Sequence, residues 1–226
     1  MLRRTVAAFL VGIATIVVAH AEMPKGQSLE GSTSKSAVIL AHGQGLDPDS
    51  QVVGTLRKAI HGELGMHTLS LQMPVVHGPK SSDKFMEYEA TFPEAFESIR
   101  NGIEFLKGKG AERIYLMGYS MGGRMTTAFL AANPDAGMAG FIGVGLLGGG
   151  KAPLNTNINL RSVKISVVDI YAENDNDAKF AEFRKAFVSD RYTQVAVAGA
   201  THDYRCCEDS VKNTVVKWLS DQEGKR

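Results

Sequence analysis

The 226-residue sequence is poor in the features that mark several classes of protein. It has 7 prolines, 1 tryptophan and 2 cysteines, and its 25 basic side chains are balanced by 24 acidic ones. A chain so close to neutral, without a block of basic residues, offers little to a phosphate backbone, so we expect no nucleic-acid partner. With 44% hydrophobic and 22% charged residues, the composition is that of an ordinary globular protein, and the length suits one domain.

The sequence also lacks the common signatures of metal and nucleotide sites. It contains no H-E-x-x-H motif, no paired metal-ligand spacing and no P-loop, so we predict neither a metal nor another cofactor. The two cysteines, Cys206 and Cys207, are adjacent, whereas exported proteins usually space their cysteines to join distant segments. We therefore favour two partly buried thiols over a disulfide between neighbours or an intermolecular bridge.

The one long apolar run lies at the N-terminus. Two arginines precede an apolar stretch at residues 6–18, and the Ala-His-Ala pattern ending at Ala21 is typical of signal peptidase sites. A membrane-spanning helix needs about 20 apolar residues, so an uncleaved anchor is the less favoured alternative. We predict a signal peptide at residues 1–21 and a periplasmic or secreted mature protein with no stable membrane insertion.

After a polar leader at residues 22–35, short apolar runs alternate with segments of helical periodicity. Runs such as 37–41 and 113–117 are uniformly apolar, which is typical of strands buried on both faces of a parallel sheet. Segments such as 92–106 space their apolar residues three or four apart, which is typical of helices that cover such a sheet. Residues 36–222 are therefore predicted to form one α/β domain, a three-layer α/β/α sandwich with a mostly parallel sheet of about six strands.

A G-x-S-x-G pentapeptide at residues 118–122 lies between a predicted strand and a predicted helix rich in small residues. Such a pattern is common by chance, but this context suits a sharp strand-to-helix turn that exposes the serine oxygen. The flanking glycines remove side chains that would collide across the turn, and the helix N-terminus favours a developing negative charge. We predict that Ser120 is a nucleophile, against the alternative of a buried serine in a glycine-rich turn.

The order of motifs along the chain resembles the α/β-hydrolase superfamily. His42 and Gly43 follow the first predicted strand, the pentapeptide follows a later one, and Asp175 and His202 follow strands nearer the C-terminus. The resemblance covers about residues 37–219. The segments 39–45 and 68–74 further resemble a bacterial exported branch of unknown function. The resemblance implies an α/β-hydrolase fold and a serine nucleophile, and it says little about the substrate.

A serine hydroxyl needs a base, and the resemblance implies that His202 is that base, in the chain order Ser, Asp, His. His61 and His67 lie in a predicted helix and at a strand start, so they are expected to be solvated or partly buried. The acid that orients the histidine is predicted to be Asp175, because it lies at the carboxyl edge of its strand. Asp177 is the less favoured alternative, and Asp169 lies inside the strand. Asp203 is expected to have a structural role.

The negative oxygen formed on attack needs two N–H donors. One is predicted to be the backbone N–H of Met121, and the other that of Gln44, or of Gly45 if the loop is shifted. His42 is better interpreted as a residue that orders this loop than as a base. His42, Gly43 and His77 are weaker candidates for contacts with the substrate.

These roles predict hydrolysis of a carboxylic ester or thioester through an acyl-enzyme on Ser120, with a small-molecule acyl compound as substrate. The only long irregular stretches, at residues 75–89 and 148–159, leave little or no room for a lid. Two alternatives stay open. One is a non-catalytic hydrolase-like protein that binds an envelope lipid or a partner, since fold alone does not prove activity. The other is acyl transfer to an acceptor other than water.

Overall fold

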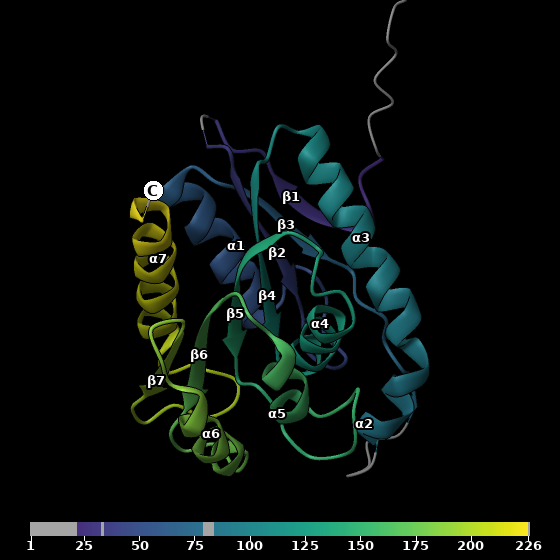
Figure 1. The fold of residues 1–226 in the computed structure, drawn as a ribbon, viewed down its shortest axis with the longest axis vertical. Helices are drawn as coiled ribbons and strands as arrows, with labels where there is room; N and C mark the ends of the chain where they lie inside the picture. The colour runs from purple at the N-terminus through teal and green to yellow at the C-terminus, as the bar shows by residue number, and fades with distance from the viewer. Residues whose placement is uncertain (1–21, 33, 79–83, 226) are drawn as a thin grey trace, which may run out of the picture.

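The core of the computed structural model is a seven-stranded sheet with the strand order β1-β3-β2-β4-β5-β6-β7 (Figure 1). The structure describes residues 22–32, 34–78 and 84–225, so the predicted signal peptide at residues 1–21 lies outside the described residues. The strands are β1 (Gly26–Leu29), β2 (Ser36–Ala41), β3 (His67–Leu71), β4 (Arg113–Tyr119), β5 (Met138–Val144), β6 (Ser166–Ala172) and β7 (Tyr192–Val197). Strands β2 to β7 are mutually parallel, whereas β1 pairs antiparallel with β3.

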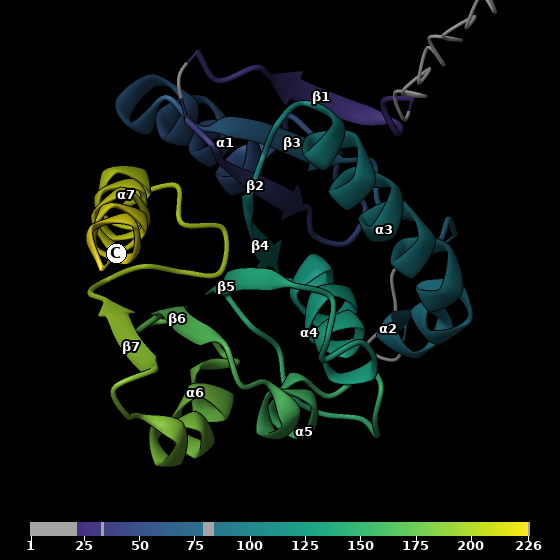
Figure 2. The same cartoon turned by 45° about the horizontal axis from the view of Figure 1, so that its top comes forward.

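Helices cover both faces of this sheet, as Figures 1 and 2 show. Helices α1 and α7 pack against one face and against each other, while α3 and α4 cover the opposite face. The α-helices are α1 (Gln51–Leu64), α2 (Lys84–Glu87), α3 (Phe92–Gly108), α4 (Met121–Ala132), α5 (Thr156–Asn159), α6 (Ala178–Arg184) and α7 (Glu208–Gly224). Single 3₁₀ turns follow α2, α5 and α6 at Tyr88–Thr91, Leu160–Ser162 and Lys185–Phe187. The predicted three-layer sandwich is confirmed.

The central strands are apolar throughout because both of their faces are covered. In β2, Ile39 packs into the core layer beneath α3 and α4, while Val38 and Leu40 pack into the layer beneath α1 and α7. All six residues of this strand are buried. Successive side chains of a strand point to opposite faces, so a strand covered on both faces shows no polar alternation. This is the physical origin of the uniformly apolar runs in the sequence.

The sheet has one strand more than the six or so that the sequence predicts. The segment 22–35, expected to be a polar leader, contains β1, which pairs with β3 from Gly26 opposite Leu71 to Leu29 opposite Thr68. Strand β1 is short, lies at the edge of the sheet and is only partly buried. Because an edge strand of this kind needs few apolar residues, its sequence carries little strand signal.

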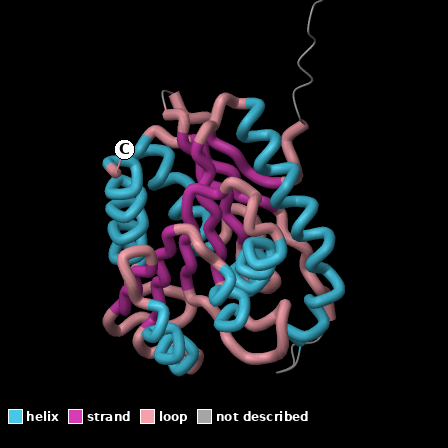
Figure 3. The backbone as a smooth tube through the Cα atoms, viewed as in Figure 1, coloured by secondary structure: helices cyan, strands magenta, loops and turns pink. Residues whose placement is uncertain are grey.

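The parallel strands bring several loops together at one edge of the sheet. The carboxyl ends of β2, β4, β6 and β7 all lie at this edge, where doubly covered parallel sheets usually carry their sites. Figure 3 shows the strands in the middle of the molecule and the connecting loops at the ends of the strands. Over the described residues, none of the helices is both long and apolar enough to cross a membrane.

Candidate active site

Ser120 occupies the sharp turn between β4 and α4. Its backbone has φ 53° and ψ −115°, a conformation with positive φ that a residue other than glycine rarely adopts. Its N–H donates to the carbonyl oxygen of Val144 in β5 at 3.1 Å, and its carbonyl oxygen accepts from Gly123 N–H at 3.0 Å. The strained residue is therefore held from both sides, as is common where a side chain must project from a tight turn.

The glycines of the pentapeptide are needed because other parts of the chain approach them closely. A Cβ atom on Gly118 would collide with Thr126 Oγ1, and one on Gly122 would collide with the main-chain oxygen of Ala41 at the end of β2. Both neighbours belong to buried, regular elements that have no room to move aside. The structure thus gives the steric reason for the glycine spacing seen in the sequence.

Ser120, His202 and Asp175 form a continuous chain of hydrogen bonds. Ser120 Oγ lies 2.9 Å from His202 Nε2, and His202 Nδ1 lies 2.6 Å from Asp175 Oδ2. With Nδ1–H donating to the carboxylate, Nε2 is left to accept the hydroxyl proton of Ser120. Ser120 is 8% exposed, whereas the His202 side chain is about one-third exposed, so these three residues meet solvent mainly at the histidine. The structure brings together the three residues that the sequence singled out.

The Asp175 carboxylate is stabilised in its ionised form. Burial by itself raises the pKa of this carboxyl, but hydrogen bonds from His202 and from the Asp177 N–H, together with the charge of His202, outweigh it and lower the pKa. The Asp177 N–H donates to Asp175 Oδ1 at 3.0 Å, which leaves Oδ2 for the histidine. Asp175 thus remains an anion next to the imidazole at neutral pH.

The other acidic candidates have separate partners. Asp169 is buried in β6, and its carboxylate binds the Arg184 guanidinium through both oxygens, at 2.8 and 3.1 Å. Asp203 accepts from the Thr201 hydroxyl at 3.0 Å and pairs with Arg205. The Asp177 main chain, rather than its carboxylate, contacts Asp175.

His42 orders the loop that follows β2. It is buried, its Nδ1–H donates to the Gly43 carbonyl at 2.9 Å, and its Nε2 accepts from the Met73 N–H at 3.0 Å. Gln72 Nε2 lies 3.1 Å from the same Nε2. Burial lowers the pKa of His42, which favours the neutral imidazole that this bonding requires. These contacts tie the loop after β2 to the end of β3.

Gly43 brings this loop against Ser120. A Cβ atom at Gly43 would lie 3.1 Å from Ser120 Cβ and 3.2 Å from Tyr119 Cε1. The next residue, Gln44, is exposed in a turn closed by the Leu46 N–H, which donates to the Gly43 oxygen at 3.3 Å. Met121 is the first residue of α4, so its N–H is one of the helix N–H groups without an acceptor four residues earlier.

None of the remaining histidines is hydrogen-bonded to Ser120, His202 or Asp175 among the described residues. His67 is buried at the start of β3, where its Nδ1 accepts from the Gly31 N–H at 3.2 Å. His61 is half-buried near the end of α1, with its Nδ1 3.3 Å from the Met66 carbonyl oxygen. His77 is exposed shortly before residues 79–83, and among the described residues it forms no hydrogen bond with Ser120, His202 or Asp175.

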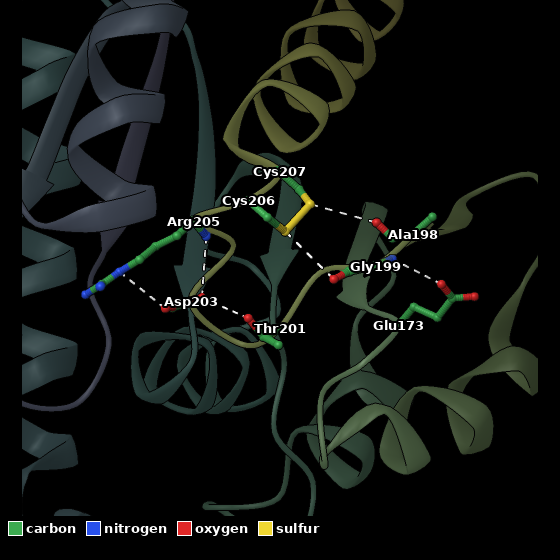
Figure 4. Close-up of a disulfide and its surroundings, with 8 residues drawn as sticks. All are labelled: Glu173, Ala198, Gly199, Thr201, Asp203, Arg205, Cys206 and Cys207. Carbon is green, nitrogen blue, oxygen red and sulfur yellow. Dashed lines mark hydrogen bonds and ion pairs between the residues drawn. A yellow bond between two sulfur atoms is a disulfide. The ribbon is translucent and has the colours of Figure 1, made fainter.

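The expectation that Cys206 and Cys207 are free thiols is wrong, because the structure joins them in a disulfide (Figure 4). The bridge lies just before α7, and the two sulfurs are each 3.8 Å from a main-chain oxygen, that of Gly199 for Cys206 and that of Ala198 for Cys207. The two ends of the loop that carries His202 therefore meet at the disulfide. The sequence shows that the two cysteines are adjacent, but it does not show that they lie close in space to Ala198 and Gly199 at the start of this loop.

Two further residues next to the site carry no recognisable signal in the sequence. Arg124, one turn along α4 from Ser120, is buried and donates to the carbonyl oxygens of Gly148, Gly149 and Leu154. Burial lowers its pKa to about 10. Tyr119 stacks on His202 and donates to its main-chain oxygen. Both contacts join segments that lie far apart in the sequence, so no local pattern announces them.

Comparison with known proteins agrees with this fold. A family model for the alpha/beta hydrolase domain matches residues 34–221. The chain is similar to an alpha-beta serine hydrolase homologue from Coxiella burnetii, with 16% identity and a TM-score of 0.66 over 86% of this chain and 90% of that one. It is also similar to a serine hydrolase without lid from Xanthomonas campestris, with 14% identity and a TM-score of 0.60 over 85% and 94% of the two chains. No curated protein matches the sequence.

Proposed function

The chain belongs to the alpha/beta hydrolase domain family, and we propose that it is a serine hydrolase that cleaves a carboxylic ester or thioester through an acyl-enzyme on Ser120. One observation carries this proposal: Ser120 Oγ is 2.9 Å from His202 Nε2, and His202 Nδ1 is 2.6 Å from Asp175. A serine, a base and an orienting acid within hydrogen-bond reach are what nucleophilic acyl transfer requires.

In the proposed mechanism, Ser120 Oγ attacks the acyl carbonyl carbon while His202 Nε2 takes the hydroxyl proton. The Asp175 carboxylate holds Nδ1–H in place and stabilises the imidazolium that forms. His202 then gives the proton to the leaving alcohol or thiol, and the acyl group stays on Ser120. A water molecule, deprotonated by His202, releases the acid and restores the serine.

The tetrahedral intermediate needs donors for its negative oxygen. We assign the Met121 N–H at the start of α4 and the Gln44 N–H in the loop after β2 to this role. The position of Gly43 against Ser120 supports the assignment, because it brings the loop to the same side of the nucleophile. The partial positive charge at the N-terminus of α4 adds to the effect, and the loss of one such donor costs about 10²–10³ in rate in other enzymes.

The preferred substrate is a small acyl compound that reaches an open site. The partial exposure of His202 favours direct access of the substrate, and so does the short length of the two segments that could form a lid, residues 75–89 and 148–159. The similar Xanthomonas structure is described as lacking a lid, and another similar structure, with 15% identity and a TM-score of 0.62 over 88% of this chain and 99% of that one, is a monoacylglycerol lipase from Paleococcus ferrophilus. The predicted signal peptide extends the proposal to a periplasmic or secreted enzyme, which fractionation of cells would test.

The decisive test is Ser120→Ala. The variant should lose turnover of p-nitrophenyl acetate and labelling by a fluorophosphonate, a probe that reacts only with an activated serine, while its melting temperature stays near that of the parent. Ser210→Ala, which changes an exposed serine on α7, is the matched control and should keep both. Turnover at the parental rate in Ser120→Ala would overturn the proposal. If the parent protein is labelled but does not hydrolyse the ester, acyl transfer to another acceptor would be indicated. If the parent protein is not labelled, a non-catalytic role would be indicated.

A further inference from the structure

Tyr119, the residue immediately before Ser120, lies between the loops that carry the reacting groups. It is only 2% exposed, and its side chain points to the sheet face covered by α1 and α7. Its ring stacks on the imidazole of His202, with the ring centroids 5.6 Å apart and the planes inclined by 26°. This distance is in the range in which offset stacking of aromatic rings is favourable.

The Tyr119 hydroxyl binds the main chain of the same histidine. It donates to the His202 carbonyl oxygen at 2.9 Å, and a longer contact of 3.4 Å joins it to Gln51 Oε1 at the start of α1. Burial, followed by the charges of Asp203 and Asp175, raises the pKa of Tyr119 to about 12. The hydroxyl therefore keeps its proton, and remains a donor, at every pH at which an esterase would be assayed.

From these contacts we propose that Tyr119 is the positioning residue of His202: its hydroxyl anchors the histidine backbone and its ring fixes the plane of the imidazole. The inference rests on the proposed hydrolase function. Asp175 holds the His202 ring at Nδ1, while Tyr119 holds the plane of that ring and the backbone of His202. Together these contacts direct Nε2 at Ser120. The same ring also lies against the loop after β2, since a Cβ atom at Gly43 would be 3.2 Å from Tyr119 Cε1.

The need for such a constraint follows from the exposure of the His202 loop. Much of the segment from Gly199 to Cys207 is in contact with solvent, and the His202 side chain is about one-third exposed. A misplacement of about 1 Å in a reacting group can cost about a hundredfold in rate. Tyr119 is buried and belongs to a central strand, so its contacts hold this loop in a fixed position next to Ser120.

The test compares Tyr119→Phe with Tyr115→Phe. Tyr115 lies on the same strand and the same sheet face, is fully buried, and donates its hydroxyl to Glu223 at 2.8 Å, far from His202. The Tyr115 hydroxyl also accepts from Arg113 Nη2 at 2.7 Å, so the melting temperature of Tyr115→Phe should fall at least as far as that of Tyr119→Phe. We expect Tyr119→Phe to lower kcat for p-nitrophenyl acetate by about three- to tenfold with KM within about twofold, and Tyr115→Phe to leave kcat within about twofold.

A second variant, Tyr119→Leu, removes the ring as well and should lower kcat by roughly tenfold to a hundredfold. The rate of fluorophosphonate labelling should fall by the same factors in both Tyr119 variants, because labelling depends on the serine–histidine geometry and not on recognition of the ester. Tyr119→Phe retains the ring and should recover part of the rate lost in Tyr119→Leu. If the leucine variant does not fold, the comparison of the two phenylalanine variants decides.

Three results would overturn the inference: an unchanged labelling rate in Tyr119→Phe, an equal loss in Tyr115→Phe, or a rise in KM with unchanged kcat. The last would mean that Tyr119 contacts the substrate instead. Absence of labelling in the parent protein would be a failure of the proposed function itself, so the two failures are distinguishable.

Discussion

Asp169 and Arg184 form an ion pair in which neither side chain is exposed, and its loss should affect stability far more than activity. The two carboxylate oxygens accept from Arg184 Nε and Nη2, and one of them also accepts from the Tyr192 hydroxyl at 3.0 Å and from Gln194 Nε2 at 2.9 Å. Arg184 donates further to Asn157 at 3.0 Å. Burial lowers the pKa of Arg184, but the charge and hydrogen bonds of Asp169 outweigh it, so the guanidinium stays charged.

The perturbation is Asp169→Asn, which keeps the shape of the side chain and removes its charge. The variant leaves a buried guanidinium without a counter-ion, and it turns an NH₂ group toward a cluster of donors. Removal of one partner from a buried pair typically costs about 3–5 kcal/mol. For a chain of this size each kcal/mol lowers the melting temperature by about 2–4 °C, so we expect a fall of roughly 6–20 °C.

The assay is thermal unfolding followed by circular dichroism, with turnover of p-nitrophenyl acetate measured at 20 °C, where the variant should still be folded. Asp221→Asn, which breaks an exposed pair with Lys217, is the control and should change stability by about 0.5 kcal/mol or less. A fall of less than about 2 °C in Asp169→Asn would refute the energetic reasoning. A folded variant without activity would show that Asp169, and not Asp175 alone, acts at the site.

Two further substitutions test the roles of Asp175 and His42. Asp175→Asn should lower kcat by roughly 10³–10⁴ without a comparable loss of stability, because the amide no longer holds the productive histidine tautomer, and steady-state kinetics with Asp177→Asn as control would check this. For His42, burial lowers the pKa in the folded protein from 6.5, so the unfolded chain binds the proton more tightly. The stability that this difference in pKa contributes is fully present above about pH 6.5 and is lost as the pH falls through that value toward the folded pKa. The free energy of unfolding measured in urea should therefore be lower at pH 5.5 than at pH 7.5, and this decrease should be smaller in His42→Gln. An equal drop in both proteins would contradict the assignment.

Much of the candidate site was accessible from the sequence because its elements carry local signals. The position of Ser120 follows from glycine spacing and from the change of periodicity between β4 and α4, and both depend on neighbours within a few residues. The sequence favours Asp175 over Asp169 because one lies at the end of a strand and the other inside it, and the structure gives the two carboxylates different partners. The prediction of His202 depends on the resemblance of the motif order to a known superfamily.

Strand β1 and the stacking of Tyr119 on His202 escape the sequence because their signals are not local. Strand β1 is an edge strand with few apolar residues, so its pairing with β3 is recognised only when the sheet is assembled. The bond between Cys206 and Cys207 joins neighbours, and their sequence alone does not distinguish a disulfide from two free thiols. The stacking of Tyr119 on His202 depends on where the loop after β7 folds back. No periodicity records such a contact, because it joins segments about 80 residues apart.

The sequence by itself determined the layered α/β fold, the turn at Ser120 and the edge of the sheet at which the site lies, since periodicity and glycine positions specify strands, helices and sharp turns. Only the tertiary structure decided how the loops at that edge meet. It set the 2.9 Å contact between Ser120 and His202, directed Asp169 to Arg184, and stacked Tyr119 on the histidine. Distances of this kind depend on the packing of whole strands and helices, which no short stretch of sequence encodes.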